Sequence, residues 1–128
     1  MSQPYLYFIR VRSGSMEYRY VGKGSDPGRM EAYARNISRV FAGQPKRPPL
    51  KRNGEPQKQG NLKYRYVHLV LAEAARRGWE IEHYPIENCS LADHTRLERL
   101  RRQQLRCNMN DGPSWHVQDF ERLAKELL

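Results

Sequence analysis

Two short tyrosine-rich segments near the N-terminus constrain the fold of this chain more than any other feature. Residues 5–11 (YLYFIRV) and 17–23 (EYRYVGK) are rich in aromatic and β-branched side chains, which favour strands. Residues 12–15 (RSGS) between them are typical of a tight turn, because Gly adopts positive φ and Ser bonds to nearby backbone. We therefore expect an antiparallel hairpin, ended by the glycines and the proline of residues 22–28.

The apolar pattern after this hairpin predicts helices and one further strand. Met30, Ala34, Ile37 and Phe41 recur at helical spacing and predict a core-facing stripe on a first helix. An adjacent stripe with the same spacing is expected to be the polar face of this helix: Arg29, Tyr33 and Asn36. A second helix is expected over residues 62–77, a strand over 79–86, a third helix from a Ser90 cap to about 106, and a C-terminal helix over 114–128. The order ββααβα plus a C-terminal helix predicts an α+β fold, in which helices flank a small three-stranded antiparallel sheet. Residues 1–128 are expected to form one domain.

The charge of the chain points to polyanions. Its 128 residues hold 23 Lys and Arg against 14 Asp and Glu, a net charge of +9. No apolar run approaches the roughly 20 residues of a membrane span, and the N-terminus does not resemble a signal peptide. With only two cysteines and no C-x-x-C motif, we expect reduced thiols and a cytoplasmic protein with no membrane partner.

Residues 43–61 interrupt the helical pattern with four prolines and five cations, and we expect a surface loop insertion. Two interpretations remain open: a solvated insertion without a role, or an arm that contacts a phosphate backbone. The second interpretation makes these cations substrate-binding residues, together with two arginines of the third helix: Lys46, Arg47, Lys51, Arg52, Arg101 and Arg102.

A polar group of residues accompanies the tyrosine hairpin. Tyr7 and Tyr20 lie on the two strands, Lys23 follows Tyr20, and Arg29 begins the first helix. A tyrosine has an unperturbed pKa near 10, so it becomes a base only where a cation lowers that value. Lys23 is the expected cation, and Arg29 suits bidentate binding of a phosphate. These residue types predict a site that handles phosphate.

The segments Tyr5-Leu6-Tyr7 and Tyr20-Val21-Gly22-Lys23-Gly24, followed by Arg29, resemble the signature of the GIY-YIG nuclease superfamily. Glu98 and Asn110 match the family's later glutamate and asparagine, so the resemblance spans residues 5 to 110. It implies a metal-dependent endonuclease that cleaves DNA, with RNA left open, by one-step attack of water. It also implies Mg²⁺, or Mn²⁺, as the cofactor.

Carried over to this chain, the resemblance gives each residue a role. Tyr7 would serve or assist the general base, Tyr20 would position the water and the scissile phosphate, and Lys23 would tune Tyr7. Arg29 would stabilise the charge of the transition state, and Glu98 would bind the metal.

Asn110 would brace the site, although Asn108 is an alternative for this role. Tyr33 stands where many members have a histidine, four residues after the arginine, so its hydroxyl would have to substitute. Tyr5 stands where the family motif has a glycine. A different class of function stays open, a non-catalytic nucleic-acid-binding module on the same scaffold.

Overall fold

The computed structural model describes residues 3–25, 28–46, 53–54 and 63–128, apart from the side chain of Met30. Its strands and helices are β1 (Tyr5–Ser13), β2 (Met16–Gly24), α1 (Arg29–Phe41), α2 (Tyr66–Arg77), β3 (Glu80–Asn88), α3 (His94–Gln104) and α4 (Phe120–Leu127). Short 3₁₀ turns at Leu91–Asp93 and Val117–Asp119 precede α3 and α4. The predicted α+β class, with a three-stranded antiparallel sheet and four helices, is confirmed.

The sheet has the order β2-β1-β3, so the central strand comes first in the chain. The hairpin turns within two residues, and Gly14 adopts a left-handed φ of 60° there. Tyr7 pairs with Gly22 on one side and with Pro85 on the other. The register between β1 and β3 shifts next to Tyr7, which lets β3 continue past Pro85 to Asn88 instead of ending near residue 86 as predicted.

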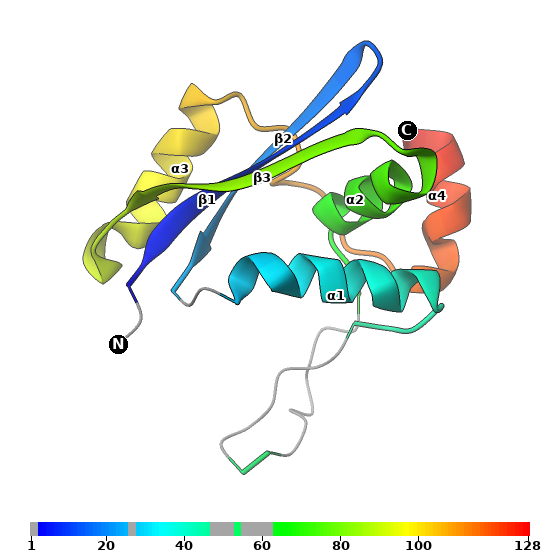
Figure 1. The fold of residues 1–128 in the computed structure, drawn as a ribbon, viewed down its shortest axis with the longest axis horizontal. Helices are drawn as coiled ribbons and strands as arrows, with labels where there is room; N and C mark the ends of the chain where they lie inside the picture. Colours follow the sequence, from blue (N-terminus) through cyan, green and yellow to red (C-terminus); the bar gives the residue numbers. More distant parts are fainter. Residues whose placement is uncertain (1–2, 26–27, 47–52, 55–62) are drawn as a thin grey trace.

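Helices cover both faces of the sheet. Helices α1, α2 and α4 lie on one face and α3 on the other (Figure 1). Because side chains alternate along a strand, Tyr7, Ile9 and Val11 enter the core under α1 and α2, whereas Leu6 and Phe8 lie on the α3 face. One face of the hairpin therefore packs under α1 and α2, and the other face packs under α3.

The predicted inner face of α1 is wrong in part. Ala34 and Phe41 are exposed, and Tyr33, from the stripe predicted to be polar, is buried against the sheet. Tyr33 buries a large aromatic surface, and its hydroxyl still has a hydrogen-bond partner in Tyr7. Ala34, on the predicted inner stripe, would bury much less apolar surface. The helix is therefore rotated so that Tyr33 faces β1.

The remaining boundaries differ from the predictions at the helix ends. Helix α2 begins at Tyr66, because Tyr64 forms an isolated antiparallel bridge with Trp115. Helix α3 ends at Gln104, and Arg106 adopts a left-handed φ of 52° beyond it. Ser90 caps the 3₁₀ turn before α3 and not α3 itself: its hydroxyl accepts from the backbone N–H of Asp93, and α3 begins at His94.

The C-terminal helix is shorter than predicted. Ser114 does not cap it: His116 precedes the 3₁₀ turn, and α4 begins at Phe120. Phe120, Leu123 and Ala124 pack with Tyr64 and Leu69 in a second apolar cluster. In the described part of the chain, no helix is both long enough and apolar enough to cross a membrane.

Candidate functional site

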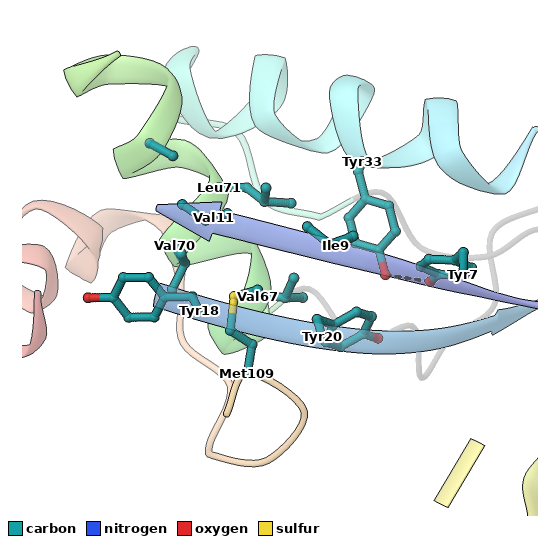
Figure 2. Packing of buried hydrophobic residues seen from close by; sticks show 11 residues of the cluster. Tyr7, Ile9, Val11, Tyr18, Tyr20, Tyr33, Val67, Val70, Leu71 and Met109 are labelled. Carbon is teal, nitrogen blue, oxygen red and sulfur yellow. Dashed lines mark hydrogen bonds between the residues drawn. The ribbon is translucent and has the colours of Figure 1, made fainter. Parts of the chain in front are cut away.

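Three tyrosines from three different elements meet under α1. The Tyr7 and Tyr33 hydroxyls are hydrogen-bonded at 2.6 Å, and the Tyr20 ring lies 6.2 Å from the Tyr7 ring and 6.3 Å from the Tyr33 ring, between centroids. Figure 2 shows Tyr33 reaching from α1 to Tyr7, with Tyr20 on the neighbouring strand. All three side chains are buried. The sequence motifs thus converge in space, and we call these residues the tyrosine cluster.

Two glycines of β2 make room for the tyrosine cluster. A Cβ at Gly22 would lie 2.2 Å from Tyr7 Cζ, so the Tyr7 ring lies directly across the Gly22 backbone. A Cβ at Gly24 would lie 2.9 Å from Tyr5 Oη and 3.1 Å from Arg29 Cγ. Neither glycine adopts a positive φ, so glycine is needed at these positions because a side chain would clash and not because of the backbone conformation.

Arg29 lies at the edge of the tyrosine cluster. It is the first residue of α1, and its Nε donates to Tyr7 Oη at 3.4 Å. Its guanidinium carbon lies 5.7 Å from the centre of the Tyr33 ring. The residue is exposed overall, so part of its charge remains available to a ligand.

The phenols of Tyr7 and Tyr33 are held protonated. Burial, with a smaller effect from Tyr20, raises the pKa of Tyr7 to about 12, although Tyr33 and Arg29 favour its phenolate. Burial also raises the pKa of Tyr33 well above its ordinary value. At neutral pH both groups therefore carry their protons and offer hydrogen bonds.

The expected partnership of Lys23 with Tyr7 is wrong. Lys23 pairs with Leu6 across the hairpin, and its Nζ donates to Thr95 Oγ1 at 2.9 Å. Lys23 is an odd-numbered position of β2, so its side chain leaves from the face opposite to Tyr20 and Gly22. Arg29 is the cation that contacts the tyrosine.

Glu98 does not join the tyrosine cluster in the part of the chain that the structure describes. It is buried on α3, which lies on the other face of the sheet, and its Oε1 accepts from Arg102 Nη2 at 2.7 Å. It makes no hydrogen bond or ion pair there with Tyr7, Tyr20 or Arg29.

The carboxylate of Glu98 is the type of ligand that Mg²⁺ prefers, but it is a single protein ligand. Mg²⁺ prefers oxygen ligands and usually keeps several waters beside one or two carboxylates. No group of three or more His, Cys, Asp or Glu side chains that suits a metal occurs among the described residues. A cation at Glu98 would therefore need water or phosphate ligands, and it would compete with Arg102.

Asn110 lies on the outer edge of β2 and occupies both backbone groups of Val21. Its Oδ1 accepts from the Val21 N–H at 3.2 Å, and its Nδ2 donates to the Val21 carbonyl at 2.6 Å. Asn108 bonds in the same way to Arg19 N and Glu17 O, but it is more exposed. Both asparagines cover the free edge of the sheet, and Asn110 does so between Tyr20 and Gly22.

The three predicted substrate-binding cations that the structure describes lie in different places. Arg101 is paired with Glu87 at 2.6 Å, and Arg102 with Glu98, so carboxylates already balance both charges. Lys46 lies beside the tyrosine cluster and is described below. The predictions for Arg47, Lys51 and Arg52 lie outside the described residues.

Three residues that contact the tyrosine cluster were not predicted from the sequence, among them His68, whose ring stacks on Tyr33 at 5.5 Å between centroids. Arg65 Nη1 lies 3.4 Å from Tyr20 Oη, and Arg65 Nη2 donates to the Asn110 carbonyl at 2.9 Å. The His83 ring lies 5.4 Å from Tyr7 and 5.5 Å from Tyr33. The period-two pattern of residues 79–83 was a usable signal for His83, whereas Arg65 lies beside a loop and carried no signal.

Chemically, the cluster offers two protonated phenols that can orient a water or a phosphate oxygen, and a guanidinium that can bind a phosphate. Comparison of the chain with known protein families, with curated protein sequences and with solved structures found no match.

Proposed function

We propose that this chain is a GIY-YIG-type endonuclease that hydrolyses DNA phosphodiester bonds with a divalent cation. The observation that carries the proposal is the convergence of Tyr7, Tyr20, Tyr33 and Arg29 from β1, β2 and α1. Buried polar groups need hydrogen-bond partners, and Tyr7, Tyr33 and Arg29 supply them to one another in one place.

Further features support this proposal. The order of the elements and the three-stranded sheet flanked by helices agree with what the family resemblance implies. Gly22, part of the matched segment, has a spatial reason in the position of the Tyr7 ring. The net charge of +9 suits a polyanionic substrate.

In the proposed reaction, Arg29 binds the non-bridging oxygens of the scissile phosphate and stabilises the charge that grows on them. The Tyr7 phenolate accepts a hydrogen bond from the attacking water, and the Tyr33 hydroxyl donates to the same Tyr7 oxygen. The water oxygen bonds to phosphorus while the bond to the leaving oxygen breaks. The water proton passes to the Tyr7 phenolate, and the leaving oxygen takes a proton from solvent.

The raised pKa of Tyr7 determines how the rate of this step depends on pH. With a value of about 12, few molecules carry a phenolate at neutral pH, so the rate rises with pH. Glu98 is the residue of this chain that would hold Mg²⁺ or Mn²⁺ once Arg102 is displaced. When bound, the ion would supply charge stabilisation to the leaving oxygen only where the bound strand reaches from Arg29 to the α3 face of the sheet, because Glu98 lies on that face.

Plasmid nicking with Mg²⁺ or Mn²⁺ tests the proposal. We expect the wild-type protein to convert supercoiled plasmid to open circles, and Tyr7→Phe to lose most of this activity. Tyr84→Phe is the matched control, since Tyr84 is half-exposed on β3 and lies against Phe8. Folded wild-type protein that nicks no plasmid with either metal would overturn the proposal.

The role of Glu98 needs its own pair of variants. Glu98→Gln and Glu87→Gln each remove a carboxylate that is paired with an arginine. We expect only Glu98→Gln to abolish metal-dependent nicking. Equal activity of the two variants would remove Glu98 from the site.

A non-catalytic nucleic-acid-binding module is the second candidate. The Glu98–Arg102 ion pair favours it, because a paired carboxylate is not a vacant metal ligand. Salt-sensitive DNA binding that Glu98→Gln leaves unchanged, without any cleavage, would support this candidate against the nuclease.

A further inference from the structure

A small polar pocket lies between α1 and the start of α2, beside the tyrosine cluster. Three cations, Arg29, Lys46 and Arg65, line it together with Asn36 and His68. Its volume is about 60 Å³. A single water needs roughly 10–15 Å³, so the pocket has room for a few waters or one tetrahedral oxyanion.

The pocket concentrates positive charge without an acid. No Asp or Glu is among the described residues that line it, and none of the three cations forms an ion pair with another described residue. Burial lowers the pKa of Lys46, and the charges of Arg29 and Arg65 lower it further. Charged groups that repel one another in a half-buried site are stabilised when an anion binds between them.

The neutral residues of the pocket also present donors. Burial, reinforced by the nearby cations, lowers the pKa of His68 to about 3, so its ring is neutral at pH 7. The ring accepts the backbone N–H of Arg65 at Nδ1, at 3.3 Å, which leaves the proton on Nε2. Asn36 Nδ2 lies 3.2 Å from Nε2. With the proton on Nε2, the Asn36 amide must turn so that its oxygen accepts there. Its NH₂ group is then a further donor.

We propose that this pocket is a second phosphate subsite, in which Lys46 and Arg65 bind one backbone phosphate of the nucleic-acid strand, while Arg29, at the border of the pocket with the tyrosine cluster, holds the neighbouring scissile phosphate. This inference rests on the proposed function, because it places the subsite along the same strand. Arg65 also bonds to Tyr20 and to the Asn110 carbonyl, so the bound phosphate is linked to the tyrosine cluster and to the braced edge of β2. The subsite positions the strand and takes no part in bond breaking.

Metal-free binding separates this inference from the nuclease proposal. A fluorescent single-stranded oligonucleotide is titrated in EDTA by anisotropy, at several salt concentrations, against wild type, Lys46→Gln and Arg65→Gln. Arg35→Gln and Lys125→Gln are the matched controls, since both residues are exposed on helices and lie outside the pocket. Inorganic phosphate is added as a competitor in a second series.

We expect each pocket variant to weaken oligonucleotide binding by about 10-fold, the loss of one charge-assisted contact. The slope of log K against log salt should become shallower by about 0.7 for each lost phosphate contact, and millimolar inorganic phosphate should compete with the oligonucleotide in wild type more than in either variant. Losses no larger than those of the controls would overturn the subsite. Competition by phosphate together with unchanged oligonucleotide affinity in the variants would show a small-anion site instead, and would also overturn it.

Two features keep the test decisive. Arg65→Gln also removes the hydrogen bonds to Tyr20 and to the Asn110 carbonyl, so its binding data are interpreted only if its unfolding temperature matches that of wild type. Lys46 makes no hydrogen bond or ion pair with the other described residues, so Lys46→Gln carries the test alone if Arg65→Gln does not fold. A protein that binds through the subsite and never cleaves would refute the nuclease proposal and leave the subsite intact.

Discussion

Replacing Gly22 by alanine tests whether the position of the Tyr7 ring determines the sequence of β2. Gly22 lies within the strand, and its φ is not positive. Without a steric conflict, alanine would stabilise such a position by about 0.5–1 kcal/mol, because glycine loses more conformational freedom on folding. The geometry predicts the opposite sign.

The new Cβ would lie 2.2 Å from Tyr7 Cζ and 2.3 Å from Tyr7 Oη. Ordinary contact begins at about 3.4 Å, so the ring or the strand must move by about 1 Å. Tyr7 is fully buried and its hydroxyl is bonded to Tyr33, so the ring has no open space to enter. We therefore expect a loss of about 1–3 kcal/mol in the free energy of unfolding, typical of overpacking.

A double-mutant cycle, with the free energy of unfolding measured in urea, tests whether the clash with Tyr7 causes this loss. Gly22→Ala is measured in wild type and in the Tyr7→Leu background, where the Cζ and Oη atoms are absent. The destabilisation should disappear or change sign in that background, with a coupling energy of at least 1 kcal/mol. In the wild-type background, nicking should fall by about 100-fold, as expected for a displacement of 1 Å at a reacting group. A Gly22→Ala protein that is more stable than wild type would refute the steric argument.

Four other predictions follow from the same geometry. The pKa of His68 is about 3 in the folded protein and near 6.5 in the unfolded chain, so its contribution to stability is fully present above pH 6.5 and is lost as the pH falls. Urea unfolding should show a loss of about 3 kcal/mol in the free energy of unfolding between pH 7 and pH 4, and the His68→Gln variant should not show this loss. The pKa of Tyr7 is raised from 10 to about 12, so nicking should increase about tenfold per pH unit from pH 7 to pH 9, and a rate that is flat with pH would exclude Tyr7 as the base. Asn110→Ala should cost about 2–4 kcal/mol in urea unfolding, since it strands two backbone groups, and Asn108→Ala clearly less; equal losses would contradict this. Lys23→Met should change nicking by less than about threefold, since Lys23 lies on the other face; a loss like that of Tyr7→Phe would contradict this placement.

Local sequence signals predict the hairpin well. The turn at Gly14 and the aromatic strands fix both the pairing and the period of two, so Tyr7 and Tyr20 share a face without any knowledge of the helices. The same period also places Lys23 on the opposite face. Proximity in sequence suggested a Lys23–Tyr7 contact, and applying the alternation strictly would have excluded it.

The rotation of α1 depends on tertiary packing, whereas the ion pair of Glu98 is local to its helix. A helix with apolar residues on two neighbouring stripes has no unique inner face in the sequence, and burial of Tyr33 against Tyr7 decides between them. The ion pair of Glu98 follows local helical spacing to Arg102. The arrangement of Arg65 and Lys46 around one pocket brings together a helix start and a loop, which periodicity cannot relate.

The measurement that tests the central claim most directly is the single-turnover rate of DNA cleavage by Arg29→Gln, compared with Arg35→Gln on the same helix. Arg29 contacts Tyr7, whereas Arg35 is exposed and lies 4.0 Å from Glu31. If Arg29 stabilises the charge on the reacting phosphate, its removal should slow cleavage by about 100- to 1,000-fold, while Arg35→Gln stays within about threefold of wild type. Equal cleavage rates in the two variants would contradict a catalytic site at the tyrosine cluster.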